Sequence, residues 1–178
     1  MSMNGKNAAL LIIDIQTASF LEEQPLFKDK ELVSNNQLLI SKARMAGIPV
    51  FFTKHDGKTG MLNQKGSPGW NIHPSMTLKP EDIIIEKNHP DAFQQTSLQQ
   101  ELTSRYINQL IITGIQTEIC VDATCRRAYS LGYDVILVAD GHSTYDSIVL
   151  KASQIINHHN SVHAQWFASV VKTKDIIF

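Results

Sequence analysis

The chain has 178 residues, enough for a sizeable core, and we expect one domain over residues 1–178. Its hydrophobic fraction of 43%, charged fraction of 19% and net charge of −1 are typical of an ordinary globular protein and argue against nucleic acid as a partner. The two cysteines, Cys120 and Cys125, are too few for a disulfide framework, so we expect a cytoplasmic protein.

Strand-like apolar runs alternate with helical patterns, which is typical of a parallel α/β sheet. Residues 8–13 predict a buried strand that ends at Asp14; this run is too short to span a membrane, and no signal-peptide pattern precedes it. Residues 31–46 predict a helix, and residues 48–53 predict a second strand. The long stretch 54–80 is rich in glycine and proline, and we expect it to form a loop that covers a substrate.

The second half of the chain continues the alternation and places two reactive side chains after strands. We predict strands over 83–86, 109–113, 134–139 and 167–173, and helices over 96–102, 121–131 and 147–160. Lys87 follows the strand 83–86, and Cys120 stands between the strand 109–113 and the next helix. Because ligands of open α/β sheets bind beyond the carboxyl ends of the strands, we expect Asp14, Lys87 and Cys120 to converge there.

The position of Cys120 suggests a nucleophile. The first turn of a helix offers unpaired N–H groups and a partial positive charge, and both favour the reactive thiolate. A small buried side chain that merely begins a helix is the alternative, and the presence of Asp14 and Lys87 weighs against it. Cys125 lies about 140° further around the helix, so we assign it to the core or to a helix face.

Three motifs together resemble the isochorismatase-like cysteine hydrolases, a superfamily that includes nicotinamidases, N-carbamoylsarcosine amidases and isochorismatases. They are Asp14-Ile-Gln16, Lys87 followed by Pro90-Asp-Ala-Phe93, and Gly114-Ile-Gln-Thr-Glu-Ile-Cys-Val121. The resemblance extends from about Ala8 to the C-terminus. It implies a three-layer, Rossmann-like α/β fold whose parallel sheet has six strands in the order 3-2-1-4-5-6, flanked by helices.

The resemblance also implies a catalytic triad of Asp14, Lys87 and Cys120. Asp14 would act as general base and then general acid, Lys87 would depress the pKa of the thiol, and Cys120 would attack a carbonyl to give a thioester. Backbone N–H groups of Gln116 and Cys120 would form the oxyanion hole. A cis peptide bond is implied between Ile115 and Gln116.

Five further residues are expected in the substrate pocket, from their match to the family or their place beside the nucleophile: Gln16, Phe20, His55, Trp70 and Ile119. Gln16 could brace Asp14 or Lys87. A purely structural role is the alternative for Gln16, Trp70 and Ile119. Phe20 stands one residue later than the aromatic of the family motif, which puts its place in the pocket in doubt.

We expect no cofactor and no bound metal. Nicotinamidases of this family hold a metal with an Asp-x-His motif, and Thr53 stands here in place of that aspartate. His55 and His73 lie 18 residues apart, which is weak as a metal site. No metal-ligand spacing is recognised among the remaining histidines, which are His89, His142, His158, His159 and His163.

The leading functional hypothesis is hydrolysis of an amide or related C–N bond in a small-molecule substrate. Vinyl-ether hydrolysis of isochorismate is the alternative, but that chemistry needs no thiol, and Cys120 is present. A non-catalytic binding or scaffold protein is a third possibility, against which the intact triad argues. We expect a homo-oligomer, because the apolar segment 164–171 needs cover, and neither nucleic acid nor a membrane as partner.

Overall fold

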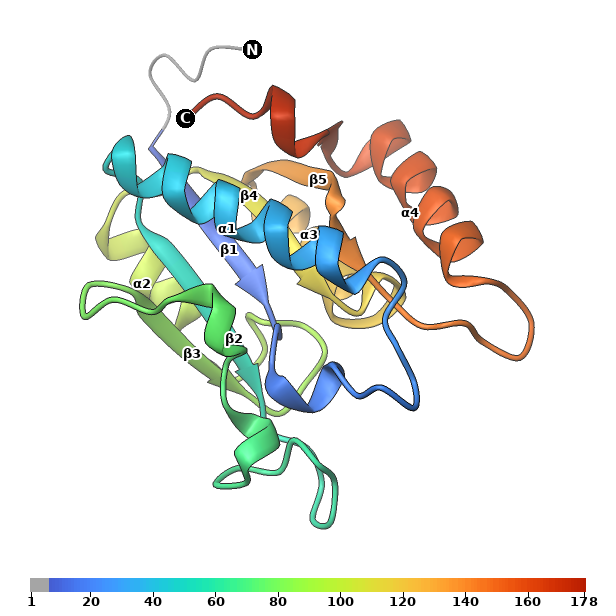
Figure 1. Ribbon diagram of the computed structural model, residues 1–178. Coiled ribbons are helices and arrows are strands. Elements are labelled where there is room, and N and C mark those ends of the chain that lie inside the picture. The colour runs from blue at the N-terminus through green and yellow to red at the C-terminus, as the bar shows by residue number, and fades with distance from the viewer. Residues whose placement is uncertain (1–6) are drawn as a thin grey trace.

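The computed structural model describes residues 7–178 and has a single six-stranded sheet in this range (Figure 1). The strand order is β3-β2-β1-β4-β5-β6 and every pair of neighbours is parallel, which confirms the predicted topology. The bounds are β1 Ala8–Ile13, β2 Val50–His55, β3 Ile83–Lys87, β4 Gln109–Ile115, β5 Asp134–Ser143 and β6 Ser169–Val171. The expected absence of a leader before β1 concerns residues 1–6, outside the described range.

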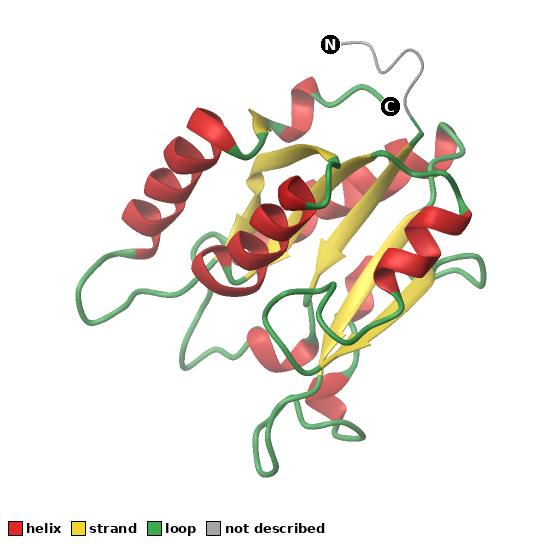
Figure 2. Ribbon diagram, turned by 180° about the vertical axis from the view of Figure 1, so that it is seen from behind, coloured by secondary structure: helices red, strands yellow, loops and turns green. Residues whose placement is uncertain are grey.

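Four α-helices accompany the sheet and give it three layers: α1 Asp29–Met45, α2 Leu98–Ser104, α3 Asp122–Ser130 and α4 Ala152–Trp166. Helix α1 lies across one face of the sheet (Figure 1), and α2 and α3 cover the other face, seen from behind in Figure 2. Helix α4 packs beside β5 and β6 at the end of the sheet. No helix within residues 7–178 combines the length and the apolarity needed to cross a bilayer.

Strand β1 lies at the centre of the sheet and is buried along its whole length. Successive side chains of a strand point to opposite faces, so β1 contributes to two separate cores. Ala9, Leu11 and Ile13 pack with α2 and α3, whereas Leu10 and Ile12 pack with α1. Such burial on both faces explains why β1 is a continuous apolar run in the sequence.

Strands β2, β3, β4 and β5 end later than the sequence indicates, and the extensions of β2 and β4 bear on the site. Strand β2 begins at Val50 and continues to His55, two residues beyond the predicted end, so Lys54 and His55 belong to the sheet and not to the loop that follows. Strand β4 continues to Ile115. Both extensions carry side chains to the edge of the sheet at which β1 ends.

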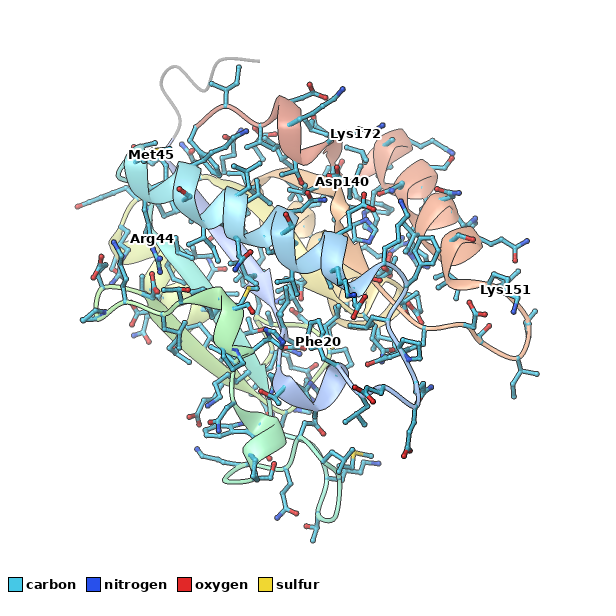
Figure 3. All side chains as sticks on the ribbon, in the orientation of Figure 1. Phe20, Arg44, Met45, Asp140, Lys151 and Lys172 are labelled. Atoms are coloured by element: carbon cyan, nitrogen blue, oxygen red, sulfur yellow. The ribbon has the colours of Figure 1, made fainter. Side chains whose placement is uncertain are left out.

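The predicted helix over 147–160 is wrong at its N-terminal end, because α4 begins only at Ala152. The Ser147 hydroxyl accepts hydrogen bonds from the backbone N–H groups of Val149 and Leu150, at 3.2 and 2.8 Å, and thereby forms a turn. The Gln154 side chain then caps the helix by accepting from Lys151 N (2.9 Å). Lys151 is labelled in Figure 3 at the end of this loop.

Gly114 allows β4 to pass very close to the end of β1. Its φ is +121°, and a Cβ atom added there would lie 2.0 Å from the carbonyl oxygen of Ile13. Only glycine fits such an approach. The contact lies one residue before Asp14 and six residues before Cys120, so it brings the segments that carry these two side chains together.

Candidate active site

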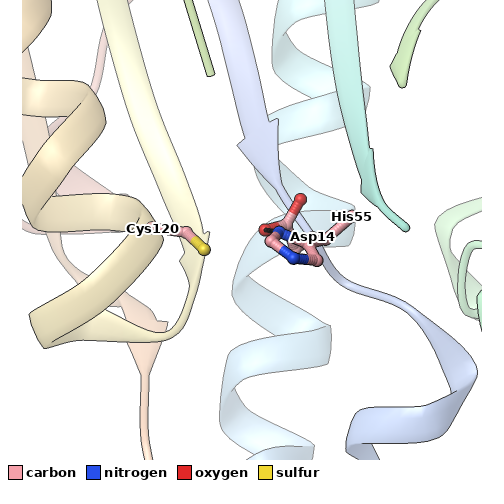
Figure 4. A group of neighbouring side chains, drawn as sticks. All are labelled: Asp14, His55 and Cys120. Atoms are coloured by element: carbon pink, nitrogen blue, oxygen red, sulfur yellow. Dashed lines mark ion pairs between the residues drawn. The ribbon is translucent and has the colours of Figure 1, made fainter. Parts of the chain in front are cut away.

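The carboxyl ends of β1, β3 and β4 bring the three predicted catalytic side chains together. Lys87 Nζ lies 2.7 Å from Asp14 Oδ2 and 3.3 Å from Cys120 Sγ. All three residues are buried, with exposed fractions of 6% for Asp14, 2% for Lys87 and 9% for Cys120. Figure 4 shows the Cys120 sulfur directed toward Asp14 and His55. An acid, a cation and a thiol therefore share one small buried volume.

Asp14 is held in a left-handed backbone conformation, with φ of +48°. The backbone N–H of Asp14 donates to Thr53 Oγ1 (3.0 Å), and the Thr53 hydroxyl donates in turn to Asp14 Oδ1 (2.5 Å). This reciprocal pair fixes the carboxylate and leaves Oδ2 directed at Lys87. The sequence analysis noted Thr53 as a departure from the family's metal motif, at the end of a predicted strand; the parallel pairing of β2 with β1 is what places it beside Asp14.

The Lys87 ammonium contacts other groups besides Asp14 and Cys120. It donates to the carbonyl oxygen of His89 (3.1 Å), and it lies 3.0 Å from His55 Nδ1. A lysine can only donate, so His55 Nδ1 must be unprotonated and act as the acceptor. Burial, and next the charge of Lys87, lower the pKa of His55, which agrees with a neutral imidazole. His55 thus contacts the triad itself, a role that its place in the sequence did not reveal.

Lys87 lowers the pKa of the Cys120 thiol, as expected, but burial of the sulfur outweighs this effect and the net pKa is raised. Cys120 lies in a single π-helical turn, Thr117–Val121, directly before α3. Burial, and next the charge of Asp14, raise the pKa of the thiol to about 12, although the attraction of Lys87 partly offsets both effects. The sequence reveals Lys87 and the start of the helix, but it does not reveal that the Cys120 sulfur is buried. Burial therefore favours the protonated thiol of Cys120 over the thiolate.

The backbone before Cys120 has an unusual geometry. The peptide bond between Ile115 and Gln116 is cis. The N–H of Val121 donates to the Gln116 carbonyl (3.1 Å), which closes the turn that carries the thiol. The assignment of the Gln116 and Cys120 N–H groups to an oxyanion hole stays a prediction.

Gln16 has a structural role at this site. Its side chain accepts from the His55 N–H (2.8 Å) and donates to the carbonyl oxygens of His55 (3.1 Å) and Trp70 (2.9 Å). These bonds join the segment after β1 to the end of β2 and to the loop beyond it. Gln16 therefore holds the backbone around the site, and its side chain hydrogen-bonds to neither Asp14 nor Lys87.

In the described structure, no hydrogen bond or ring contact joins Phe20, Trp70 or Ile119 to Cys120. Phe20, labelled in Figure 3, packs its ring on His73 with centroids 4.4 Å apart. The Lys54 ammonium lies 3.0 Å from the centre of the Trp70 ring. Ile119 is 44% exposed and precedes the buried Cys120 in the chain. Their role in a pocket stays a prediction, and Ile119 alone combines exposure with a position next to Cys120 in the chain.

A metal ion at the triad is opposed by charge. Asp14, His55 and Cys120 offer ligand atoms that all lie within 4.8 Å of one another. However, the Lys87 ammonium lies within 3.3 Å of an atom of each. Coulomb repulsion between this cation and a divalent ion would be large in a buried site. The absence of a catalytic metal stays a prediction.

His142 braces the turn that carries Cys120. Its Nδ1 lies 2.9 Å from the Thr117 hydroxyl, and its Nε2 lies 2.9 Å from Asn160 Oδ1 on α4. Burial lowers the pKa of His142 from 6.5 to about 4, so the imidazole is neutral in the folded protein.

The buried His142 should make folding stability depend on pH. The unfolded chain binds a proton at His142 below pH 6.5 and the folded chain only near pH 4, so its stabilising contribution is lost as the pH falls through this window. Between pH 7.5 and 5 the loss attributable to His142 should be about 2 kcal/mol. Urea unfolding of the native protein and of His142→Gln at both pH values tests this. Equal pH dependence in the two proteins would contradict it.

Comparison with known proteins gives consistent results. The family model for the isochorismatase domain matches residues 8–160. A streptothricin hydrolase from Streptomyces noursei is 34% identical over 139 residues, which cover 78% of this chain and 55% of that protein. Nicotinamidase 3 from Arabidopsis thaliana is 29% identical over 164 residues, covering 84% of this chain and 80% of that protein.

A solved structure extends the similarity to three dimensions. The crystal structure of an isochorismatase from Pseudomonas putida KT2440 superimposes with a TM-score of 0.91 at 31% identity, covering 96% of this chain and 90% of that one. The chain spans only about half the length of the streptothricin hydrolases that it matches.

Proposed function

Because this chain belongs to the isochorismatase family, we propose that it is a cysteine hydrolase that cleaves an amide or related C–N bond of a small molecule. The observation that carries the proposal is the position of Lys87 Nζ, 2.7 Å from the Asp14 carboxylate and 3.3 Å from the Cys120 thiol. Three such groups in mutual contact, buried at the carboxyl edge of a parallel sheet, suit nucleophilic attack on a carbonyl.

The first half of the proposed reaction forms a thioester. Asp14 takes the proton of Cys120 while the sulfur attacks the substrate carbonyl, since the thiol is protonated at rest. Lys87 offsets the negative charge as it moves between the carboxylate and the sulfur. Backbone N–H groups of Gln116 and Cys120 stabilise the oxyanion. Asp14 then returns the proton to the leaving amine, and the C–N bond breaks.

The second half releases the acid product. Water attacks the thioester carbonyl, Asp14 accepts a proton from that water, and the Cys120 sulfur leaves with a proton to restore the thiol. Throughout the cycle Asp14 is the group that exchanges protons. Thr53 and Lys87 keep its two oxygens in fixed orientations. The contact of His55 Nδ1 with the Lys87 ammonium helps to fix the position of this cation in the site.

A panel of small amides, screened for release of ammonia or amine, tests the proposed reaction class. Nicotinamide and streptothricin belong in the panel, because relatives are named for these compounds. Isochorismate belongs in it as well, because a structural relative is named for isochorismate hydrolysis. We expect turnover of an amide that is lost in the Cys120→Ala variant. Turnover of isochorismate alone, undiminished in that variant, would replace the proposal with vinyl-ether chemistry.

Replacing Lys87 with methionine should make Cys120 harder to ionise. The charge of Lys87 lowers the pKa of the thiol, so its removal raises that pKa, and each unit lowers the thiolate fraction tenfold, about 1.4 kcal/mol. The rate of iodoacetamide labelling as a function of pH measures the change. A Cys125→Ala background leaves Cys120 as the single thiol. An unshifted profile would mean that Lys87 has no electrostatic role toward the sulfur.

We also propose that the protein is a homo-oligomer. Large apolar side chains are exposed in the loop before α4 and at its end, including Ile148 at 106%, Val149 at 85% and Trp166 at 71%. Exposed apolar groups of this kind are usually covered by a partner. Light scattering should give a multiple of 19.9 kDa, and Ile148→Asp should reduce it. A mass of one chain at working concentration would refute the proposal.

A reducing compartment such as the cytosol is the proposed location. Both Cys120 and Cys125 are free thiols. The nucleophile requires a free thiol, and a reducing environment preserves it.

A further inference from the structure

A second cluster of potential ligand groups lies between α3 and α4, apart from the triad. Asp122 is the first residue of α3, and His159 and His163 lie one helical turn apart on α4. Their ligand atoms all lie within 4.8 Å of one another. The sequence analysis assigned these histidines no ligand role, although their spacing of four residues places both on one helix face.

The distances in this cluster match a coordination sphere. Asp122 Oδ1 lies 3.2 Å from His159 Nδ1 and 3.0 Å from His163 Nε2. Tetrahedral zinc with bonds of about 2.0–2.1 Å holds neighbouring ligand atoms ~3.3 Å apart. Ligand nitrogens of the two imidazoles lie within 4.8 Å of each other, and the side chain of His159 is 17% exposed, which leaves it room to rotate toward the centre.

The orientation of His163 is the second observation. Its side chain is 1% exposed, yet among the residues described neither ring nitrogen has a hydrogen-bond partner. Its Nε2 is only 3.0 Å from the Asp122 oxygen without the alignment of a hydrogen bond. When two ligand atoms bind the same metal ion, each lone pair points at the metal and not at the other ligand. The positions of His163 Nε2 and the Asp122 oxygen fit this arrangement.

The guanidinium of Arg126 also contacts the cluster. Its Nε lies 3.0 Å from Asp122 Oδ1 and 2.9 Å from Oδ2. The Arg126 side chain is 40% exposed and stacks beside Phe167, so it can keep its bond to Oδ2 while Oδ1 binds an ion. A carboxylate that ligates a metal through one oxygen and is hydrogen-bonded through the other is common around metal sites.

We propose that Asp122, His159 and His163 form a binding site for a divalent zinc-type ion, distinct from the catalytic triad. Two imidazoles and one carboxylate are a zinc ligand set, and a water molecule completes four-coordination on the exposed side. The ion would join the first residue of α3 to α4. Because Cys120 lies two residues before Asp122, the bound ion would stabilise the segment that carries the nucleophile.

Zinc titration of the full chain tests the site. The Cys120→Ala variant is the background, since it removes the thiol of the other group of potential ligands, Asp14, His55 and Cys120. After removal of metal with a chelator, calorimetric titration with zinc chloride should show one ion bound per chain. Zinc should also raise the melting temperature of this protein, because an ion that binds only the folded state stabilises it.

Matched histidine variants assign the ligands. His159→Ala in the same background should weaken zinc binding by at least about 100-fold, since loss of even an outer-shell partner costs ~10–100-fold. His158→Ala is the control, because this exposed neighbour on α4 is outside the cluster, and it should leave the affinity unchanged. His159→Ala is preferred to His163→Ala, since His163 is buried.

Each other outcome overturns the proposal. If no saturable binding occurs in the Cys120→Ala protein, the cluster is an ion pair of Asp122 with its histidines and Arg126. If His159→Ala binds zinc as tightly as its parent, the ion is held elsewhere. Cobalt(II) provides an independent readout, since a four-coordinate site should give visible absorption bands that are lost in His159→Ala and kept in His158→Ala.

Discussion

Replacing Cys120 with alanine should abolish turnover while the fold remains intact. The thiol forms the covalent bond to the substrate in the proposed reaction, and loss of a covalent nucleophile costs on the order of 10⁴–10⁶ in rate. The Asp14–Lys87 ion pair does not depend on the sulfur and remains. Steady-state kinetics on a substrate found in the panel, with circular dichroism as a check on folding, measures the effect.

Cys125→Ala is the matched control for this prediction. Cys125 lies in the core between the sheet and α3, with no exposed surface, and belongs to no part of the triad. Its truncation should lower stability modestly and leave turnover nearly unchanged. If Cys120→Ala kept full activity, the thioester route would be wrong; loss of activity in Cys125→Ala with the fold intact would point to the wrong thiol.

Asp14→Asn should lose turnover by about 10²–10⁴, because the variant keeps the shape of the side chain but cannot accept the thiol proton. The loss should fall on kcat more than on KM, since proton transfer occurs in the transition state. The Asp14→Asn substitution should also lower the stability of the fold. Lys87 is fully buried, so an uncompensated ammonium would destabilise the protein by ~3–5 kcal/mol.

A double variant separates the two effects of this substitution. Asp14→Asn combined with Lys87→Met removes both members of the ion pair and should regain much of the stability lost in Asp14→Asn. If Asp14 is the base, turnover should stay low in the double variant. Recovery of turnover together with stability would show that Asp14 serves only to neutralise Lys87.

The sequence predicted the strands and helices of this protein well because they depend on local patterns. Strands such as β1 are buried on both faces and therefore appear as unbroken apolar runs. The convergence of Asp14, Lys87 and Cys120 then follows from parallel strands that end at one edge. The start of α4 was misjudged because the Ser147 hydroxyl can cap a turn as well as a helix, and the local pattern does not distinguish the two.

Properties that depend on contacts across the fold could not be predicted. Thr53 and Asp14 are 39 residues apart, yet they exchange two hydrogen bonds. The contact of His55 with Lys87 was not foreseen, because β2 continues two residues further than its predicted end. The pKa of Cys120 was expected to be low from its charged neighbour, whereas burial of the sulfur dominates.

The buried, protonated state of Cys120 has a consequence for the durability of the protein. Peroxide and related oxidants attack the thiolate, and exposure governs how often they reach it. Cys120 is 9% exposed, and its pKa is raised to about 12, so almost none of it is ionised in the absence of substrate. A cysteine stored in this form should resist conversion to sulfenic acid far better than a preformed thiolate would. In the proposed mechanism the protein would thereby keep its nucleophile usable through oxidative episodes and would generate the reactive form anew in every catalytic cycle.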